Sequence, residues 1–156
     1  MKKIYNYIQE KLVINKDSKT KKYSCQPKDK KELRKIIKER LKKDKNANLN
    51  DIDVSNIIDI SGLFNGLDPH NIDISKWDVS NITDMQEMFF NCKNFNSDIS
   101  KWDVSKCTDM FYMFGNCYKF NCDLNNWDIS NVEDKRGIFH NCESLQSPKW
   151  FNGYTV

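Results

Sequence analysis

Aspartate is the residue type in this chain whose spacing most directly suggests chemistry. Two columns of aspartates recur every 25 residues, namely Asp73, Asp98 and Asp123, and Asp78, Asp103 and Asp128. Stacked turns of a chain place equivalent residues about 5 Å apart, so such carboxylates could share a calcium ion. Calcium-binding β-rolls use a glycine-rich nonapeptide, however, and the five glycines of this chain never form that pattern. We therefore interpret the aspartates as caps of helices and turns, and we expect no metal site and no cofactor.

The six cysteines are a second set of residues that could bind metal. Cys92, Cys117 and Cys142 are 25 residues apart, no CxxC pair occurs, and the two histidines occupy different positions of the repeat. This pattern argues against a zinc site, which needs closely spaced ligands. We interpret the column as buried thiols that pack as small apolar groups.

Motifs of the common enzyme classes are missing from the sequence. It contains no GxSxG, no HExxH and no glycine-rich phosphate-binding loop. Two histidines at unrelated positions cannot form a repeated catalytic pair. We expect a protein that is not an enzyme.

A 25-residue repeat must position these side chains, and aromatic residues mark its period. The tryptophan column is Trp77, Trp102 and Trp127, and the phenylalanine column is Phe64, Phe89, Phe114 and Phe139. Such self-similarity indicates stacked units that contact only their neighbours, with the aromatic columns as a core ladder. Within a unit we expect a short strand near 95–100, a turn near 77–81 and helical turns near 84–92, with Asp84 as a helix N-cap.

Three regions divide the chain. Residues 1–48 form a basic capping region, in which a helix at about 30–44 is predicted by the apolar face of Leu33, Ile36, Ile37 and Leu41. Residues 49–145 hold about four repeats. Residues 146–156 form a C-terminal cap, because Trp150 comes two residues before the position that the repeat predicts.

The repeats resemble a known family. The motif MF–x–x–C–x–x–F–N, followed by D–I–S–x–W–D–V–S, occurs at residues 88–105. Over about residues 49–145 it resembles the BspA-type leucine-rich-repeat proteins, in particular the branch found in mycoplasma surface lipoproteins. The resemblance implies an α/β repeat fold: a short leucine-rich-repeat-like solenoid with stacked parallel strands and short helical turns, capped by the basic N-terminal helix. It also implies a bacterial or phage binding module, often at the cell surface.

Hydropathy argues for a different location. No run of 18 apolar residues occurs, so we expect no membrane insertion. The lysines near the N-terminus are followed by an interrupted apolar stretch, without a cleavage site or a lipobox cysteine. We therefore expect a cytoplasmic protein.

The function that we expect is binding of a protein partner through the strand face of the solenoid. Residues 49–156 carry 16 acidic and 8 basic side chains, which favours a basic partner. The candidate contact residues alternate with buried apolar positions, and they are Asp73, Ser75, Asp98, Ser100, Asp123 and Asn125.

Two alternative functions stay open, and the first of them concerns residues 1–48. They hold 17 Lys and Arg against 6 Asp and Glu, so the region could bind nucleic acid through Lys31, Lys35, Lys38 and Lys42. Glu32 and Glu39 interrupt that stripe, which also fits the solvated face of a capping helix. The second alternative is a phage or mobile-element inhibitor of a host complex. A homodimer is a further alternative, since solenoid ends can stack.

Overall fold

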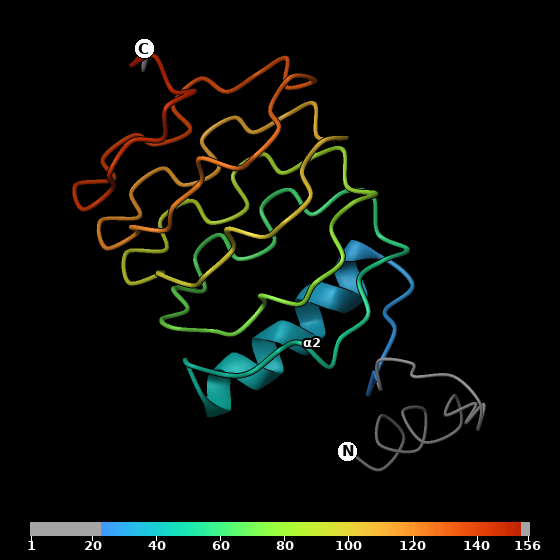
Figure 1. The fold of residues 1–156 in the computed structure, drawn as a ribbon. Helices are drawn as coiled ribbons and strands as arrows, with labels where there is room; N and C mark the ends of the chain where they lie inside the picture. The colour runs from blue at the N-terminus through green and yellow to red at the C-terminus, as the bar shows by residue number, and fades with distance from the viewer. Residues whose placement is uncertain (1–22, 154–156) are drawn as a thin grey trace.

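The structure is a computed structural model that describes residues 23–153. Residues 1–22, which belong to the expected capping region, and the last three residues of the expected C-terminal cap lie outside the described part. Helix α2 spans Lys30–Lys43 and is the one helix within 23–153. The rest of the described chain winds in successive coils, which rise from α2 toward the C-terminus (Figure 1).

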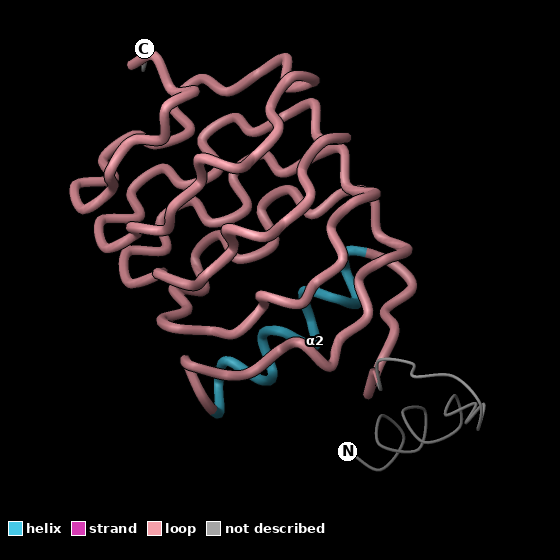
Figure 2. The backbone as a smooth tube through the Cα atoms, in the orientation of Figure 1, coloured by secondary structure: helices cyan, strands magenta, loops and turns pink. Residues whose placement is uncertain are grey.

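The expected solenoid of stacked parallel strands and helical turns is wrong. Within residues 23–153 no strand is formed, residues 95–100 are irregular, and residues 84–92 form turns where helix was expected (Figure 2). The reason is visible in the hydrogen bonds. Met88 N donates to Met85 O at 3.2 Å, and Trp102 N donates to Ile99 O at 3.1 Å. These bonds close consecutive β-turns, which share the i, i+3 apolar spacing of a helix.

Backbone hydrogen bonds between equivalent positions hold neighbouring coils together. Met85 N donates to Asp109 O at 2.9 Å, and Thr108 N donates to Thr83 O at 2.9 Å. Isolated parallel bridges link Asp59, Asp84, Asp109 and Asp134 in series. Two further parallel bridges join Cys25 to Ile52 and Asn48 to Asp73, and residues 95–100, where a strand was predicted, form no bridge.

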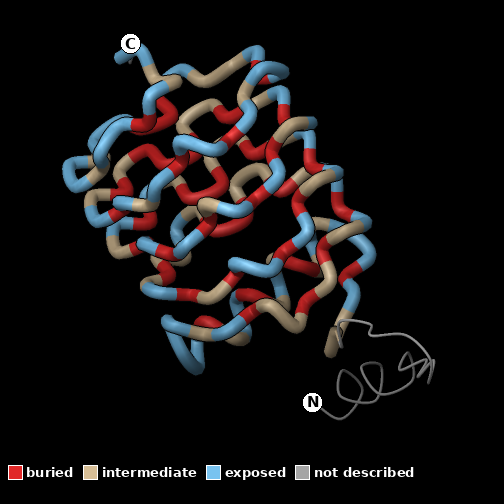
Figure 3. The backbone as a smooth tube through the Cα atoms, viewed as in Figure 1, coloured by how far each residue is buried: buried red, intermediate tan, exposed pale blue. Residues whose placement is uncertain are grey.

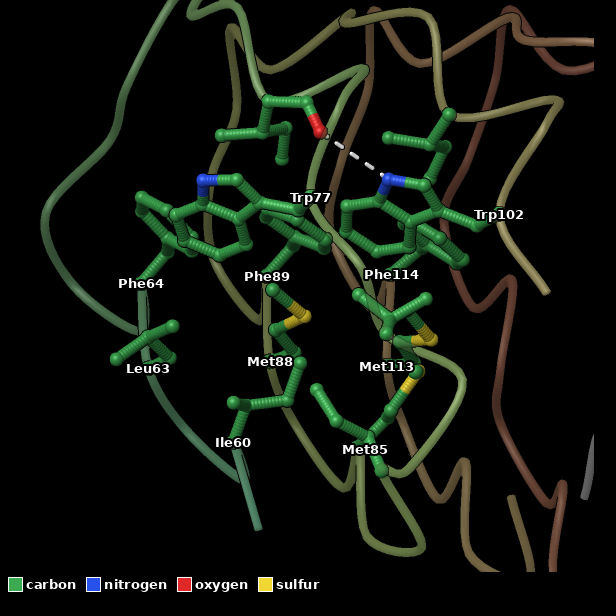
Figure 4. Close-up of a cluster of buried hydrophobic side chains, with 14 of the residues drawn as sticks. Ile60, Leu63, Phe64, Trp77, Met85, Met88, Phe89, Trp102, Met113 and Phe114 are labelled. Carbon is green, nitrogen blue, oxygen red and sulfur yellow. Dashed lines mark hydrogen bonds between the residues drawn. The ribbon is translucent and has the colours of Figure 1, made fainter. Parts of the chain in front are cut away.

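The core is the aromatic ladder that the repeat predicted. Ring centroids are 5.2 Å apart between Phe64 and Phe89 and 5.6 Å apart between Phe89 and Phe114. Trp77 and Trp102 stack with a 2° angle between their planes (Figure 4). All five of these side chains are buried, and buried residues line the inside of every coil (Figure 3). Aromatic side chains supply the most buried area per residue, which short coils require.

The cysteine column belongs to the same core. Cys92 Sγ donates to Phe64 O at 3.3 Å, and Cys117 Sγ donates to Phe89 O at 3.0 Å. Burial raises the pKa of Cys92 and of Cys142 to about 12 and that of Cys117 still further. These thiols are protonated and unreactive at neutral pH, as expected for packing groups.

Helix α2 covers the first coil through an apolar face. Leu33, Ile37 and Leu41 are buried against it. Asp29 caps the helix, because its Oδ1 accepts a hydrogen bond from Glu32 N at 2.8 Å. The helix at about 30–44 is thus present where the apolar spacing predicted it.

Trp150 closes the opposite end of the stack. Its Nε1 donates to Leu124 O at 2.8 Å, as Trp127 Nε1 donates to Ile99 O at 3.2 Å one coil earlier. Trp150 therefore takes the position of the next tryptophan in a coil shortened by two residues. Phe151 packs edge-on against Phe139, with 5.1 Å between ring centroids, so the last apolar layer is covered.

Candidate interaction surface

Each predicted contact aspartate begins a tight turn. Asp98 Oδ1 accepts hydrogen bonds from Ser100 N at 3.0 Å and from Ser100 Oγ at 2.7 Å. Asp73 and Ser75 repeat this geometry. Asp123 repeats it with the backbone and side-chain amides of Asn125. These are Asx-turns, in which the side chain imitates a backbone turn. We call the six residues the Asp ladder, which consists of Asp73, Ser75, Asp98, Ser100, Asp123 and Asn125.

The Asp ladder lies on the outside of the stack, over a rigid support. Ile74, Ile99 and Leu124 are buried between its members, whereas Asp98 and Asp123 are exposed. The backbone under the ladder is anchored, because the Ile74 and Ile99 carbonyls accept the tryptophan indole N–H of the next coil. The predicted alternation of polar and buried positions is present, although the backbone is a series of turns.

Hydrogen bonds favour the ionised form of Asp73 and Asp98 in the ladder. The Ser100 hydroxyl and backbone N–H lower the pKa of Asp98. Partial burial opposes ionisation of Asp73, but hydrogen bonds from Ser75 outweigh it and lower the pKa of Asp73 as well. The ladder therefore presents negative charge at neutral pH, held at fixed positions by the turns.

The basic residues of α2 divide into two sets. One set faces the coils: Lys30 pairs with Asp59 at 2.7 Å, Arg40 with Asp51 at 2.5 Å, and Arg34 donates to the carbonyls of Gly62, Leu63 and Asn65. The other set is exposed and forms no ion pair with the described part of the chain. It consists of Lys43 and the four predicted lysines, Lys31, Lys35, Lys38 and Lys42.

The family of the protein follows from a comparison with family models. Residues 31–150 match the family described as Mycoplasma protein of unknown function, DUF285. The chain belongs to the DUF285 family. No curated protein and no solved structure matches it. The DUF285 match begins in α2 and ends at Trp150, so both ends of the stack belong to the family unit.

One expectation about this DUF285 protein is corrected by its turns. Asp84 is no helix N-cap, because no helix follows it. Its Oδ1 accepts from Gln86 N at 2.9 Å, and Asp109 Oδ1 accepts from Phe111 N at 2.8 Å. The same capacity of aspartate to bond a nearby N–H serves here in an Asx-turn.

A group of partly exposed aromatic residues was missed by the sequence argument. Tyr112 contacts Phe90, Phe111 and His140, with ring centroids 5.9, 4.7 and 5.5 Å away. We call these four residues the aromatic ridge. A signal was present in the sequence: at these positions the repeat changes residue type from coil to coil, whereas the core columns keep theirs.

The described residues offer no evidence for two other kinds of site. Among them, no group of three His, Cys, Asp or Glu side chains could hold a metal ion. None of their helices has the length and apolar character needed to span a bilayer.

Proposed function

We propose that this protein is a non-enzymatic module that binds a protein partner through the Asp ladder. The observation that carries the proposal is the repetition of one ordered carboxylate turn on three successive coils. Because the turns already fix the side chains, a partner would lose little additional side-chain entropy on binding. The packed aromatic core beneath gives the ladder a rigid base.

The chemistry of the ladder favours a partner with a basic surface. The pKa values of Asp73 and Asp98 are lowered, so both are anionic at neutral pH. Ser75 and Asn125, which are exposed, and the half-buried Ser100 add short polar groups that can donate or accept hydrogen bonds. Electrostatic complementarity of this kind accelerates association and rejects acidic competitors.

The test removes charge and retains the turns. In Asp98→Asn/Asp123→Asn, the amide oxygen still accepts the turn hydrogen bonds, so folding is preserved. Tagged protein is used to capture partners from a lysate of the source cells after nuclease treatment. We expect one protein retained in near-equal amount by the wild type and lost by the double variant.

The matched control is Glu143→Gln, which removes an exposed carboxylate of the last coil. It should retain the partner. Equal retention by the wild type, the control and the double variant would refute the ladder as the binding surface.

The exposed lysines of α2 support a second candidate function, which is association with nucleic acid. Four phosphate contacts would give a slope of about −3.6 for log K against log salt on duplex DNA. Replacing Lys31, Lys35, Lys38 and Lys42 by glutamine should abolish that binding. Capture of many proteins that disappear on nuclease treatment would favour this function over the first.

Further proposals rest on the sequence alone. We propose a BspA-type relationship for the repeat motif at residues 88–105, and a cytoplasmic location. A role as a phage-borne inhibitor and a homodimer are compatible with a binding module. Cell fractionation and sedimentation measurements would test location and oligomeric state.

A further inference from the structure

The rings of the aromatic ridge are not part of the buried core. Its members Phe90, Phe111 and Tyr112 are partly exposed and His140 is exposed, whereas the neighbouring ladder of Phe89 and Phe114 is buried. Among the described residues, the Tyr112 hydroxyl has no hydrogen-bond partner. Aromatic groups that are rigidly packed but incompletely covered are characteristic of protein–protein hot spots.

Tyr112 occupies a backbone position that favours glycine. Its φ is 48°, and the equivalent residues Gly62 and Gly137 have φ of 60° and 63°. A bulky residue in this region is uncommon and costs conformational energy. The next coil accommodates the ring, because a Cβ on Gly137 would lie only 2.5 Å from it. The ridge is therefore built from a tyrosine at a position where two other coils use glycine and one uses Glu87, with φ of 51°, and from a glycine that makes room for the ring.

The ridge already holds one cation from the protein itself. The Arg136 guanidinium lies over the Phe111 ring, 5.3 Å from its centroid, and pairs with Asp134 at 2.6 Å. A ring and a carboxylate together thus bind a guanidinium at this place. Arginine suits such a site because its planar group stacks on rings and pairs with carboxylates.

Two of the carboxylates beside the aromatic ridge could pair with a further cation. In the bridged column, the outer members Asp59 and Asp134 pair with Lys30 and Arg136. The inner members, Asp84 and Asp109, form no ion pair within residues 23–153. Asp109 lies two residues before Phe111 in the same turn. Negative charge without a cationic partner therefore adjoins the exposed rings.

We propose that the aromatic ridge is a second docking surface, and that its partner is an arginine-bearing protein segment. An arginine of the partner stacks on the ridge and pairs with Asp84 or Asp109, as Arg136 does with Phe111 and Asp134. The surface is separate from the Asp ladder, so this inference stands or falls independently of the proposed function.

A hexa-arginine peptide is the probe, titrated into the ¹⁵N-labelled full chain and followed by NMR chemical shifts. We expect shifts of the amides of residues 84–90, 109–112 and 136–140, and weaker binding by hexa-lysine. Tyr112→Gly removes the ring and places at a positive φ the residue that other coils use there. It should weaken the affinity read from those shifts roughly tenfold.

Two further variants make the result decisive. Asp109→Asn keeps an acceptor for Phe111 N and should also weaken ridge binding, which covers the case in which Tyr112→Gly fails to fold. Asp98→Asn/Asp123→Asn should leave ridge binding unchanged. Undiminished ridge binding in folded Tyr112→Gly, or in Asp109→Asn, would overturn the inference, as would shifts confined to the Asp ladder.

Discussion

The tryptophan column is anchored by a hydrogen bond that no other apolar residue could make. Trp77, Trp102 and Trp127 donate their indole N–H to the carbonyls of Leu49, Ile74 and Ile99, at 2.9, 3.1 and 3.2 Å. Each acceptor lies in the preceding coil. A phenylalanine could fill most of the same space but would remove this bond between coils, and the Ile74 carbonyl would keep only its local bond from Trp77 N at 3.1 Å.

Trp102→Phe should therefore reduce the stability of the fold, even though it replaces one aromatic ring by another. We expect a loss of about 0.5–1.5 kcal/mol in the free energy of unfolding, because the hydrogen bond between the coils is lost. Trp102→Ala should cost about 3–5 kcal/mol because it also leaves a cavity. Urea unfolding measures both. A loss below about 0.5 kcal/mol for Trp102→Phe would show that the indole bond is dispensable.

Asp84 should weaken the fold at neutral pH. Its pKa is raised, mainly by burial and further by the Asp59 and Asp109 carboxylates. The folded state then holds the proton more tightly than the unfolded state does. The resulting cost is absent below the unfolded pKa, and it develops as pH rises through the raised folded pKa. We expect Asp84→Asn to increase stability at pH 7 by less than about 1 kcal/mol and to have little effect at pH 3.

Asp103 provides the opposite case for the same measurement. Hydrogen bonds from the Ser105 hydroxyl and N–H lower its pKa, so ionisation of Asp103 stabilises the fold above pH 4 and the benefit is lost as pH falls. Asp103→Asn should reduce the melting temperature at pH 7. If Asp84→Asn and Asp103→Asn both raised stability at pH 7, or both lowered it, this electrostatic assignment would be contradicted.

At the scale of elements, α2 substitutes for a coil that would precede the first one. In later coils the carbonyls at this position accept amides of the coil before, as Met88 O accepts from Phe64 N at 2.9 Å. The equivalent carbonyl of the first coil, Leu63 O, accepts from the Arg34 guanidinium instead. A side chain thus satisfies an edge that would otherwise be unpaired.

Arg34→Met tests this role, since methionine keeps the length and apolar character of the side chain but cannot donate. We expect a loss of about 2–4 kcal/mol in the free energy of unfolding, because several charge-assisted bonds disappear. The control is Lys35→Met, on the exposed face of the same helix turn, which should change stability by no more than about 0.5 kcal/mol. Similar losses in the two variants would mean that Arg34 does not cap the edge.

Sequence reasoning succeeded where the periodicity of a pattern had one structural meaning. Leu33, Ile36, Ile37 and Leu41 share a face in a helix but not in a strand, where Leu33 and Ile36 would point to opposite faces, and α2 is there. The spacing of Met85 and Met88 suits both a helix and successive turns, so the same argument wrongly predicted helical turns near residues 84–92. Asp98 and Asp123 of the Asp ladder are exposed, and their role in partner contact stays a prediction. The aromatic ridge depends on Tyr112 stacking over Gly137 of the next coil, which a pattern within one repeat cannot reveal.

At the scale of the whole molecule, each coil is stabilised by its two neighbours. Met85 N and Phe89 N donate to the next coil at 2.9 Å each, and Phe114 N donates to Ile138 O at 2.9 Å. In the coil that holds Ile138, the Ile138 N–H donates only locally, to Lys135 O at 3.2 Å. Stability in such a stack is approximately a sum over neighbours, so it should be greatest in the middle.

Amide hydrogen exchange should therefore be graded along the stack. We expect the slowest exchange at Met85, Phe89 and Phe114, and exchange at least about tenfold faster at Ile138, because opening the last coil breaks contacts on one side only. NMR detection of exchange resolves these amides individually. Uniform rates from the first coil to the last would contradict the nearest-neighbour description.

Binding of a protein partner through the Asp ladder, as we propose, is tested most directly by deuterium exchange on the complex with the captured partner, compared with the free chain. We expect new protection at residues 73–75, 98–100 and 123–125, and none at the exposed lysines of α2. Protection confined to the α2 face that carries Lys31, Lys35, Lys38 and Lys42 would contradict it and would make the basic helix the functional surface.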